Sequence, residues 1–336
     1  MNPIVRNILS SMLSIAVVAT PAMAEGLQDK LNNLQISGFV DASYSGDNQS
    51  KTRGTGLDQI ELDIEYAKDN VGLRFDLQTT PSTPGPMTGD QLTEQGYVYV
   101  NLPILGDDGA TFTFGKFNAP IGWELLDAPD MYQFSHAMVF NNGIPTNFTG
   151  GSLASKFGII DAIIYGGNYV DLNGVQPNGS QSFGTRVGLS PMDGLNLGLS
   201  YLHTTNPGSS TDRTIDIDFT YDAIENLIIG VEYNTKKNGI TPANPIANTS
   251  GGYFATAHYD ITSSVGATIR FGTYDYDTSL VGKANQTTLA LTSVLGDGLG
   301  ALFEYRTLQN TMASAIDGAP ANTTLKAYAF EMTYAF

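Results

Sequence analysis

The sequence contains no cysteine among its 336 residues. This absence excludes disulfides, cysteine-ligated metal sites and thiol catalysis. Charged side chains are also scarce, because Asp, Glu, Lys and Arg make up only 15% of the chain, below the usual quarter. Basic residues are the scarcer class, with 16 Lys and Arg against 33 Asp and Glu and a formal net charge of −17. A chain this acidic is not expected to bind nucleic acid or an anionic surface through bulk charge.

The chain also lacks any run of about 20 apolar residues that would predict a membrane-spanning helix. Its one N-terminal apolar stretch, residues 8–20, is too short to span a bilayer as a helix. Arg6 precedes this stretch, and Ala22-Met23-Ala24 follows it as a small-residue cleavage site. This pattern is typical of a secretory signal peptide. We therefore predict a signal peptide over residues 1–24 and a short periplasmic lead-in of open role over residues 25–34.

From residue 35 onward, side chains alternate with a period of two, which is the period of a β-strand. Ile60, Leu62, Ile64 and Tyr66 lie on one face of such a strand, while acids and a glutamine lie on the other. We predict strands over residues 35–45, 57–68, 70–79, 93–102, 110–117, 151–160, 162–170, 182–190, 195–205, 213–222, 227–237, 252–261, 265–276, 285–295, 299–309 and 323–336. The lengths match the roughly 9–11 residues of a tilted transmembrane strand.

Short turns alternate with long polar connections between these strands. The pattern is typical of a transmembrane antiparallel β-barrel, in which short turns face the periplasm and long loops face outward. A soluble β-sandwich or β-helix also has short alternating strands, but the signal peptide and the even strand count favour the membrane barrel. We predict an all-β barrel of about 16 strands over residues 35–336, with 14 or 18 strands as the alternatives.

The last strand ends the chain on an aromatic residue. Phe330, Met332, Tyr334 and Phe336 share one face, which we expect to contact lipid. A terminal aromatic residue preceded by apolar residues at every second position resembles the closing strand of bacterial outer-membrane proteins. In those proteins it is the recognition signal for the barrel-assembly machinery. The resemblance implies that Tyr334 and Phe336 carry this signal and that the protein lies in the outer membrane of a Gram-negative bacterium.

Residues 118–150 form the longest connection, and it is rich in apolar and aromatic residues. Connections of this length are usually functional or disordered, and its composition argues against disorder. We expect this third external loop to fold into the barrel and narrow the pore. Its acids, Glu124, Asp127 and Asp130, would face basic wall residues that point inward by parity. Those predicted wall residues are Arg74, Lys156, Arg186, Arg270 and Arg306. Inward acids outnumber inward bases, which predicts a mild preference for cations.

The start of this connection carries a recurring motif. It reads Gly115-Lys116-Phe117, then Pro120, Gly122 and Glu124, followed by Asp127-Ala128-Pro129. The motif resembles the OmpL-like β-barrel porins, the porin-2 group. That resemblance implies an outer-membrane porin through which small hydrophilic solutes and ions diffuse passively. Sixteen-stranded porins are usually trimers, so the resemblance also suggests a homotrimer.

Two other classes stay open as alternatives, a structural or adhesive barrel and a barrel hydrolase. The three histidines are His136, His203 and His258, and no G-x-S-x-G or H-E-x-x-H motif is present. Ser135 and His136 are adjacent, but successive side chains diverge in extended structure and do not form a nucleophile and base by themselves. We therefore predict no enzymatic activity, no cofactor and no metal. The expected partners are outer-membrane lipid, the assembly machinery and diffusing solutes.

Overall fold

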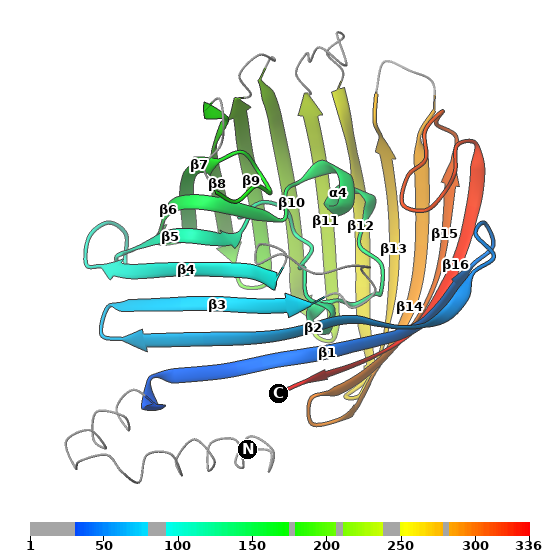
Figure 1. The fold of residues 1–336 in the computed structure, drawn as a ribbon, viewed down its shortest axis with the longest axis horizontal. Helices are drawn as coiled ribbons and strands as arrows, with labels where there is room; N and C mark the ends of the chain where they lie inside the picture. Colours follow the sequence, from blue (N-terminus) through cyan, green and yellow to red (C-terminus); the bar gives the residue numbers. More distant parts are fainter. Residues whose placement is uncertain (1–30, 80–91, 175–178, 206–210, 238–248, 278–281) are drawn as a thin grey trace.

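The computed structural model describes residues 31–79, 92–174, 179–205, 211–237, 249–277 and 282–336. Sixteen antiparallel strands form a closed barrel in which neighbours in sequence pair and β1 closes on β16 (Figure 1). The strands are β1 (Leu34–Asp47), β2 (Arg53–Lys68), β3 (Val71–Thr79), β4 (Thr93–Leu102), β5 (Ala110–Asn118), β6 (Asn147–Phe157), β7 (Ile160–Asn168), β8 (Gln181–Met192), β9 (Leu195–Thr205), β10 (Asp212–Ile224), β11 (Leu227–Lys237), β12 (Thr249–Thr262), β13 (Val265–Asp275), β14 (Ala284–Gly296), β15 (Leu299–Asn310) and β16 (Thr323–Ala335). The predicted fold class and the strand number of sixteen are confirmed.

The alternation of the sequence separates an apolar outer face from a polar lumen. On β16, Phe330 is 46% exposed on the outer face, while its neighbour Glu331 is 3% exposed inside. The terminal residue closes the barrel, because the Phe336 amide donates to the Gly38 carbonyl at 3.0 Å and the Gly38 amide donates back at 3.3 Å. The predicted orientation of the terminal apolar row is confirmed. No helix within the described ranges is long and apolar enough to cross a membrane.

Several predicted boundaries were wrong by a few residues: β2 begins at Arg53 instead of residue 57 and β12 at Thr249 instead of residue 252. In the hairpin β6–β7 the turn itself is displaced. The chain turns at Gly158 and Ile159, two residues before the predicted turn, and β6 begins at Asn147 instead of residue 151. Gly158 adopts a positive φ of 58°, which a glycine does at little cost. At the other end, Phe148 packs on the inner aromatic residues Phe117 and Tyr165. This contact extends β6 upstream along β5.

The predicted N-terminal boundaries are only partly visible. The proposed signal peptide over residues 1–24 and most of the lead-in over residues 25–34 lie outside the described residues. Leu34, at the end of that lead-in, already belongs to β1. The Ala67 amide also donates to the Asn33 carbonyl at 3.1 Å, so pairing with β2 begins immediately before β1.

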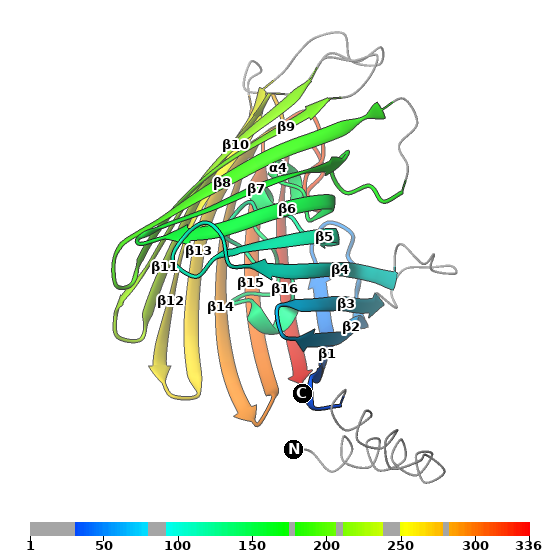
Figure 2. The same cartoon turned by 90° about the vertical axis from the view of Figure 1, so that its left-hand side faces the viewer.

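The long connection between β5 and β6 comprises residues 119–146, slightly less than the predicted 118–150. It contains the short 3-10 helix η2 (Ala128–Asp130) and the helix α4 (Met138–Gly143). Figures 1 and 2 show α4 within the ring of strands, and η2 contacts β1 and β16 while α4 contacts β11 to β13. We call this connection the long loop.

The wall of the barrel is uneven in height. β3, β5 and β7 have 9 residues each and β4 has 10, whereas β10, β12, β14 and β16 have 13 or 14. The two views show this short side beside the tall strands (Figures 1 and 2). The short side therefore exposes a shallower band of apolar residues.

Candidate functional site

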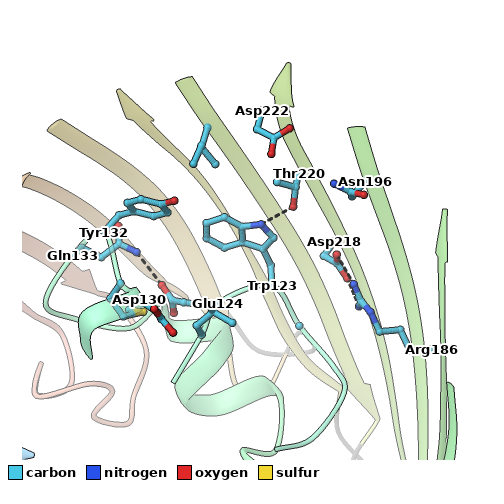
Figure 3. Close-up of a pocket in the computed structure, with 14 residues that line it drawn as sticks. Trp123, Glu124, Asp130, Tyr132, Gln133, Arg186, Asn196, Asp218, Thr220 and Asp222 are labelled. Atoms are coloured by element: carbon cyan, nitrogen blue, oxygen red, sulfur yellow. Dashed lines mark hydrogen bonds and ion pairs between the residues drawn. The ribbon is translucent and has the colours of Figure 1, made fainter. Parts of the chain in front are cut away.

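The first side chain of the long loop that hydrogen-bonds to the wall is that of Trp123, after Ile121 has packed on wall residues such as Phe148 and Leu202. The Trp123 amide donates to Glu232 Oε2 of β11 at 2.8 Å. Its indole Nε1 donates to Thr220 Oγ1 of β10 at 2.7 Å, as Figure 3 shows. Its ring lies against Phe254 of β12, with ring centroids 5.9 Å apart. Backbone and side chain of one residue are thus fixed to three strands, which holds this part of the loop against the inner wall.

The neighbouring Glu124 makes a buried ion pair with Arg270 of β13, the strand next to β12. Arg270 Nη1 donates to Glu124 Oε1 at 2.6 Å, and the two side chains are 0% and 1% exposed. Gln133 Nε2 and the Ala137 amide donate to the same carboxylate at 2.9 and 2.6 Å. Arg270 Nη2 donates to the Ser135 carbonyl at 2.6 Å. Glu124 and Arg270, both predicted from the sequence, are brought together, but they neutralise each other and serve as an anchor.

The second half of the loop packs on the wall mainly through apolar side chains. Met138 and Val139 of α4 are each 1% exposed, in a cluster that includes Phe254, Tyr274 and Leu308. Full burial of one such side chain is worth about 1.5–3 kcal/mol. The apolar side chains of the loop therefore pack inside the barrel, against apolar and aromatic residues of the wall.

Asp127 and Asp130 take no part in the contacts of this anchor. Asp130 is exposed and lines a cavity, whereas Asp127 faces Glu94 of β4 and Glu61 of β2. Burial raises the pKa of Asp127 to about 7, and the nearby charges of Glu94 and Asp130 add to the shift. None of the predicted wall arginines forms an ion pair with Asp127 or Asp130 in the described part of the chain.

Two cavities lie on either side of the loop segment 122–125. The first, of about 440 Å³, opens toward the short-turn end and is lined by Asn196, Asp222 and Ile228 (Figure 3). The second, of about 250 Å³, opens toward the long-loop end at Asn118 and Thr146. We call them the turn-side and loop-side cavities. Both are lined by residues 122–125 of the loop and by Arg186 of β8, so the two cavities adjoin at these residues.

Arg186 is itself paired. Its guanidinium donates to both carboxylate oxygens of Asp218 on β10, with Nη2 to Oδ1 at 2.8 Å, and to Ser200 Oγ at 3.2 Å. The Arg186 side chain remains 22% exposed. Arg186 is therefore a partly exposed cation that lines both cavities.

The other predicted wall residues are distributed around the lumen. Arg74 Nε donates to Asp76 Oδ1 at 2.8 Å, and Arg74 Nη2 lies 3.8 Å from Asp63 Oδ1. Arg306 lines a third cavity near Ser135 and Glu304, and Lys156 lies exposed near the β6–β7 turn. Only Arg186 and Arg270 therefore lie beside the Glu124 segment of the loop.

Sequence reasoning missed three contributors, namely the anchor Glu232, the ion-pair partner Asp218 and the acid Glu94. The alternation of side chains along β10 and β11 predicts that Asp218 and Glu232 point into the lumen. It predicts the same for every other inward residue, so it does not single out these two. Glu94 is the second residue of β4, where a period of two has hardly begun. No pattern in the sequence joins these residues to the loop.

The packing position of Trp123 can be tested directly by fluorescence, because this is the chain's only tryptophan. A Cβ at Gly230 would lie 2.5 Å from the Trp123 ring. We expect Gly230→Ala to displace the indole, to shift its fluorescence emission to the red as it meets water, and to destabilise the barrel by about 1–3 kcal/mol. The matched control is Gly151→Ala, whose Cβ would lie 3.5 Å from Phe112. Unchanged emission in Gly230→Ala would contradict the packing of the indole against Gly230.

Comparisons with known proteins agree with the architecture. The family model described as "Putative beta-barrel porin-2, OmpL-like" matches residues 33–336. A search of curated protein sequences found no match. Among solved structures, the anion-selective porin from Comamonas acidovorans aligns with a TM-score of 0.66 at 15% identity, covering 90% of this chain and 99% of that one.

Two further structures align over similar lengths. Salmonella typhi OmpF in complex with daunomycin has a TM-score of 0.66 at 12% identity, covering 90% of this chain and 97% of that one. The trimer form of Vibrio cholerae OmpT has a TM-score of 0.64 at 13% identity, covering 90% and 99%. Likeness at such low identity establishes the fold alone. Since the family model spans almost the whole chain, the protein belongs to the OmpL-like porin-2 family of β-barrels.

Proposed function

We propose that the protein is an outer-membrane porin through which small hydrophilic solutes and ions diffuse passively. The observation that carries this proposal is the meeting of the turn-side and loop-side cavities at Arg186 and the loop segment 122–125. Their volumes of about 440 and 250 Å³ far exceed the roughly 10–15 Å³ that one water needs. Porin family membership and the closed 16-stranded barrel support the same role.

In this proposal the long loop sets the width of the channel. Trp123 and the Glu124–Arg270 pair hold the segment 122–125 in the lumen, opposite Arg186. A solute passing between the cavities would contact Arg186, Asp218 and Thr220, which all line the turn-side cavity. Because these groups are polar and partly charged, they favour hydrated ions and small polar molecules over apolar ones.

We further propose a mild preference for cations. The inward bases are largely cancelled, since Arg74, Arg186 and Arg270 each pair with a carboxylate. Buried luminal acids outside these three pairs remain in excess, namely Asp41, Glu61, Glu94, Asp216, Glu232, Glu304 and Glu331. Asp130 adds an exposed carboxylate to the turn-side cavity. An acidic lining attracts cations and repels anions.

The test is single-channel recording of the folded protein in a planar bilayer under a salt gradient. We expect discrete conductance steps and a reversal potential biased toward cations. Asp130→Asn should move that potential toward zero, because it removes an exposed negative charge from the turn-side cavity. Asp193→Asn, in the β8–β9 turn, removes the same charge outside the cavities described here and should leave the potential unchanged. A folded barrel that passes no current would overturn the porin proposal.

We infer a channel without catalytic activity. Ser135 and His136 form separate contacts, because Ser135 binds Arg270 and Glu304 while His136 Nε2 lies 3.0 Å from the Leu125 carbonyl. His136 also stacks on Phe140, with ring centroids 4.2 Å apart. His258 is hydrogen-bonded to Thr268 and stacked on Tyr132. These contacts support structural roles for both histidines.

We also propose that three copies associate through the short side of the barrel. On this side, Val98 of β4 and Phe114 of β5 form a cross-strand pair and are 56% and 60% exposed. An apolar hollow of about 480 Å³ lies beside them, lined by Leu73, Val100 and Phe112. Because β3 to β5 are short, the apolar band on this face spans the smallest part of the bilayer thickness. Burial of this face against a second copy is therefore more favourable than burial of the taller faces.

The oligomeric state tests this association. Val98→Lys should convert a detergent-solubilised trimer to monomers, because a lysine in the contact would be desolvated without a partner. The control is Leu291→Lys on the tall strand β14, where the side chain is 53% exposed, and it should leave the mass unchanged. Light scattering coupled to size-exclusion chromatography measures both. A wild-type protein that is monomeric across several mild detergents would argue against the trimer.

A further inference from the structure

Three acids from separate segments converge where the long loop meets the short side of the barrel. They are Glu61 of β2, Glu94 of β4 and Asp127 immediately before η2. Carboxylate oxygens of all three lie within 4.8 Å of one another. Glu61 and Glu94 are 2% and 1% exposed. Like charges this close and this dry cannot all stay ionised without a compensating positive charge.

The atoms of this group lack the partners that a closed acid cluster would need. Glu94 Oε2 and Asp127 Oδ1 are buried and have no hydrogen-bond partner among the described residues. The other oxygen of Glu94 accepts one long bond from Asn118, at 3.4 Å. Asp127 occupies the N-cap of η2, yet its side chain caps no amide there. Glu61 Oε2 accepts from Gln59 Nε2 at 3.2 Å, and the Glu61 and Glu94 carboxyl groups are hydrogen-bonded to each other. Glu94 Oε2 and Asp127 Oδ1 are therefore the acceptor atoms of the group that no N–H donor reaches.

A neighbouring group provides a contrast. Glu61 also lies within 4.8 Å of Asp63 and Asp76, but those two acids have a base. Arg74 Nε donates to Asp76 Oδ1 at 2.8 Å, and Arg74 Nη2 lies 3.8 Å from Asp63. No ion pair is formed by Glu61, Glu94 or Asp127 within the part of the chain described. Of these two neighbouring groups, the one where the loop joins the wall has no base among the described residues.

We propose that Glu61, Glu94 and Asp127 bind a calcium ion that fastens the long loop to β2 and β4. Calcium takes oxygen ligands at about 2.3–2.6 Å, so two oxygens on one ion can lie up to about 5 Å apart. It also accepts the irregular geometry of ligands from three separate segments, whereas magnesium demands a near-ideal octahedron. Waters would complete its shell. The ion compensates the buried charges and crosslinks parts of the chain separated by 33 residues or more.

This site goes beyond the proposed diffusion and does not depend on it. It also departs from the expectation of no metal that the sequence alone supports. The sequence contains no ligand spacing typical of a metal site, since the three acids meet only through the path of the long loop. Nothing in the test below measures conductance, so the failure of one proposal leaves the other standing.

The test is thermal unfolding of the folded, chelator-treated protein in detergent, with added calcium, added magnesium or neither. A site that binds only the folded state should raise the Tm by about 5 °C at a hundredfold excess of calcium over its Kd. Magnesium should have a smaller effect at the same concentration. Glu94→Gln and Asp127→Asn should each abolish the calcium response, while Glu331→Gln, which removes a buried luminal acid of β16, should retain it. Heat-modifiable mobility on a gel verifies that each variant folds.

Calorimetric titration of the wild-type protein with calcium gives a second readout that needs no variant. One ion per chain is expected. A wild-type protein with no Tm response and no binding heat at millimolar calcium would overturn the proposal. So would a full response in both Glu94→Gln and Asp127→Asn. If Glu94→Gln is more stable than the wild type and calcium affects neither, the acids share protons, and the calcium site is wrong.

Discussion

Replacing Arg270 by methionine is expected to destabilise the folded barrel by about 3–5 kcal/mol and to release the long loop. The substitution removes a fully buried guanidinium that donates to Glu124 and Ser135. Methionine fills much of the same volume but leaves the Glu124 carboxylate buried beside Gln133 without its counter-charge. Denaturant unfolding measures the loss of stability, and single-channel recording should show larger or noisier conductance as the loop moves.

The control for this variant is the double replacement Glu124→Gln and Arg270→Met. It removes both charges, so the uncompensated carboxylate disappears and a large part of the stability should return. Glu124→Gln alone should also be destabilising, since it leaves Arg270 buried without an acid. If Arg270→Met is as stable as the wild type, the ion pair does not anchor the loop.

Replacing Arg186 by glutamine is expected to give the largest change in ion selectivity. Arg186 lies where the two cavities meet, and its charge offsets Asp218. Its removal leaves Asp218 as an unbalanced negative charge at the junction. For an ion passing about 8 Å away at an effective dielectric constant of about 40, one charge changes its energy by roughly 1 kcal/mol, or about fivefold in relative occupancy. The reversal potential under a salt gradient should therefore shift further toward cations.

Lys156→Gln is the matched control for Arg186→Gln. It removes the same charge from an exposed position near the β6–β7 turn, where solvent screens it. We expect it to change the reversal potential much less. An equal shift in the two variants would mean that the net charge of the lumen sets selectivity and that the junction at Arg186 has no special weight.

Strand number and the direction of each side chain followed from the sequence, because both depend on a local period of two. Glu61, Arg74 and Glu331 share the inner face with Arg270 for that reason alone. The boundary errors at β6 and β7 arose where this local signal is weakest. Gly150 and Gly151 carry no side chain to mark a face, and only the contact of Phe148 with Phe117 and Tyr165 extends the strand.

The candidate site was predicted in part. The acids of the long loop and the inward arginines could be named, because parity and composition identify luminal and apolar groups. Which acid meets which base could not. Glu124 and Arg270 are separated by 146 residues, and nothing local distinguishes this pairing from one with Arg74 or Arg306.

By itself, then, the sequence determined the barrel, its inner and outer faces and which strand residues point into the lumen. Each of these follows from the alternation of successive side chains along a strand. Only the tertiary structure decided the path of the long loop. That path turns Glu124 from a free acid into an anchor, brings Asp127 to Glu61 and Glu94, and places Arg186 between two cavities. The physical reason is that a loop has no period, and its course follows from the summed contacts of Trp123, Met138 and Val139 with a wall that must already exist.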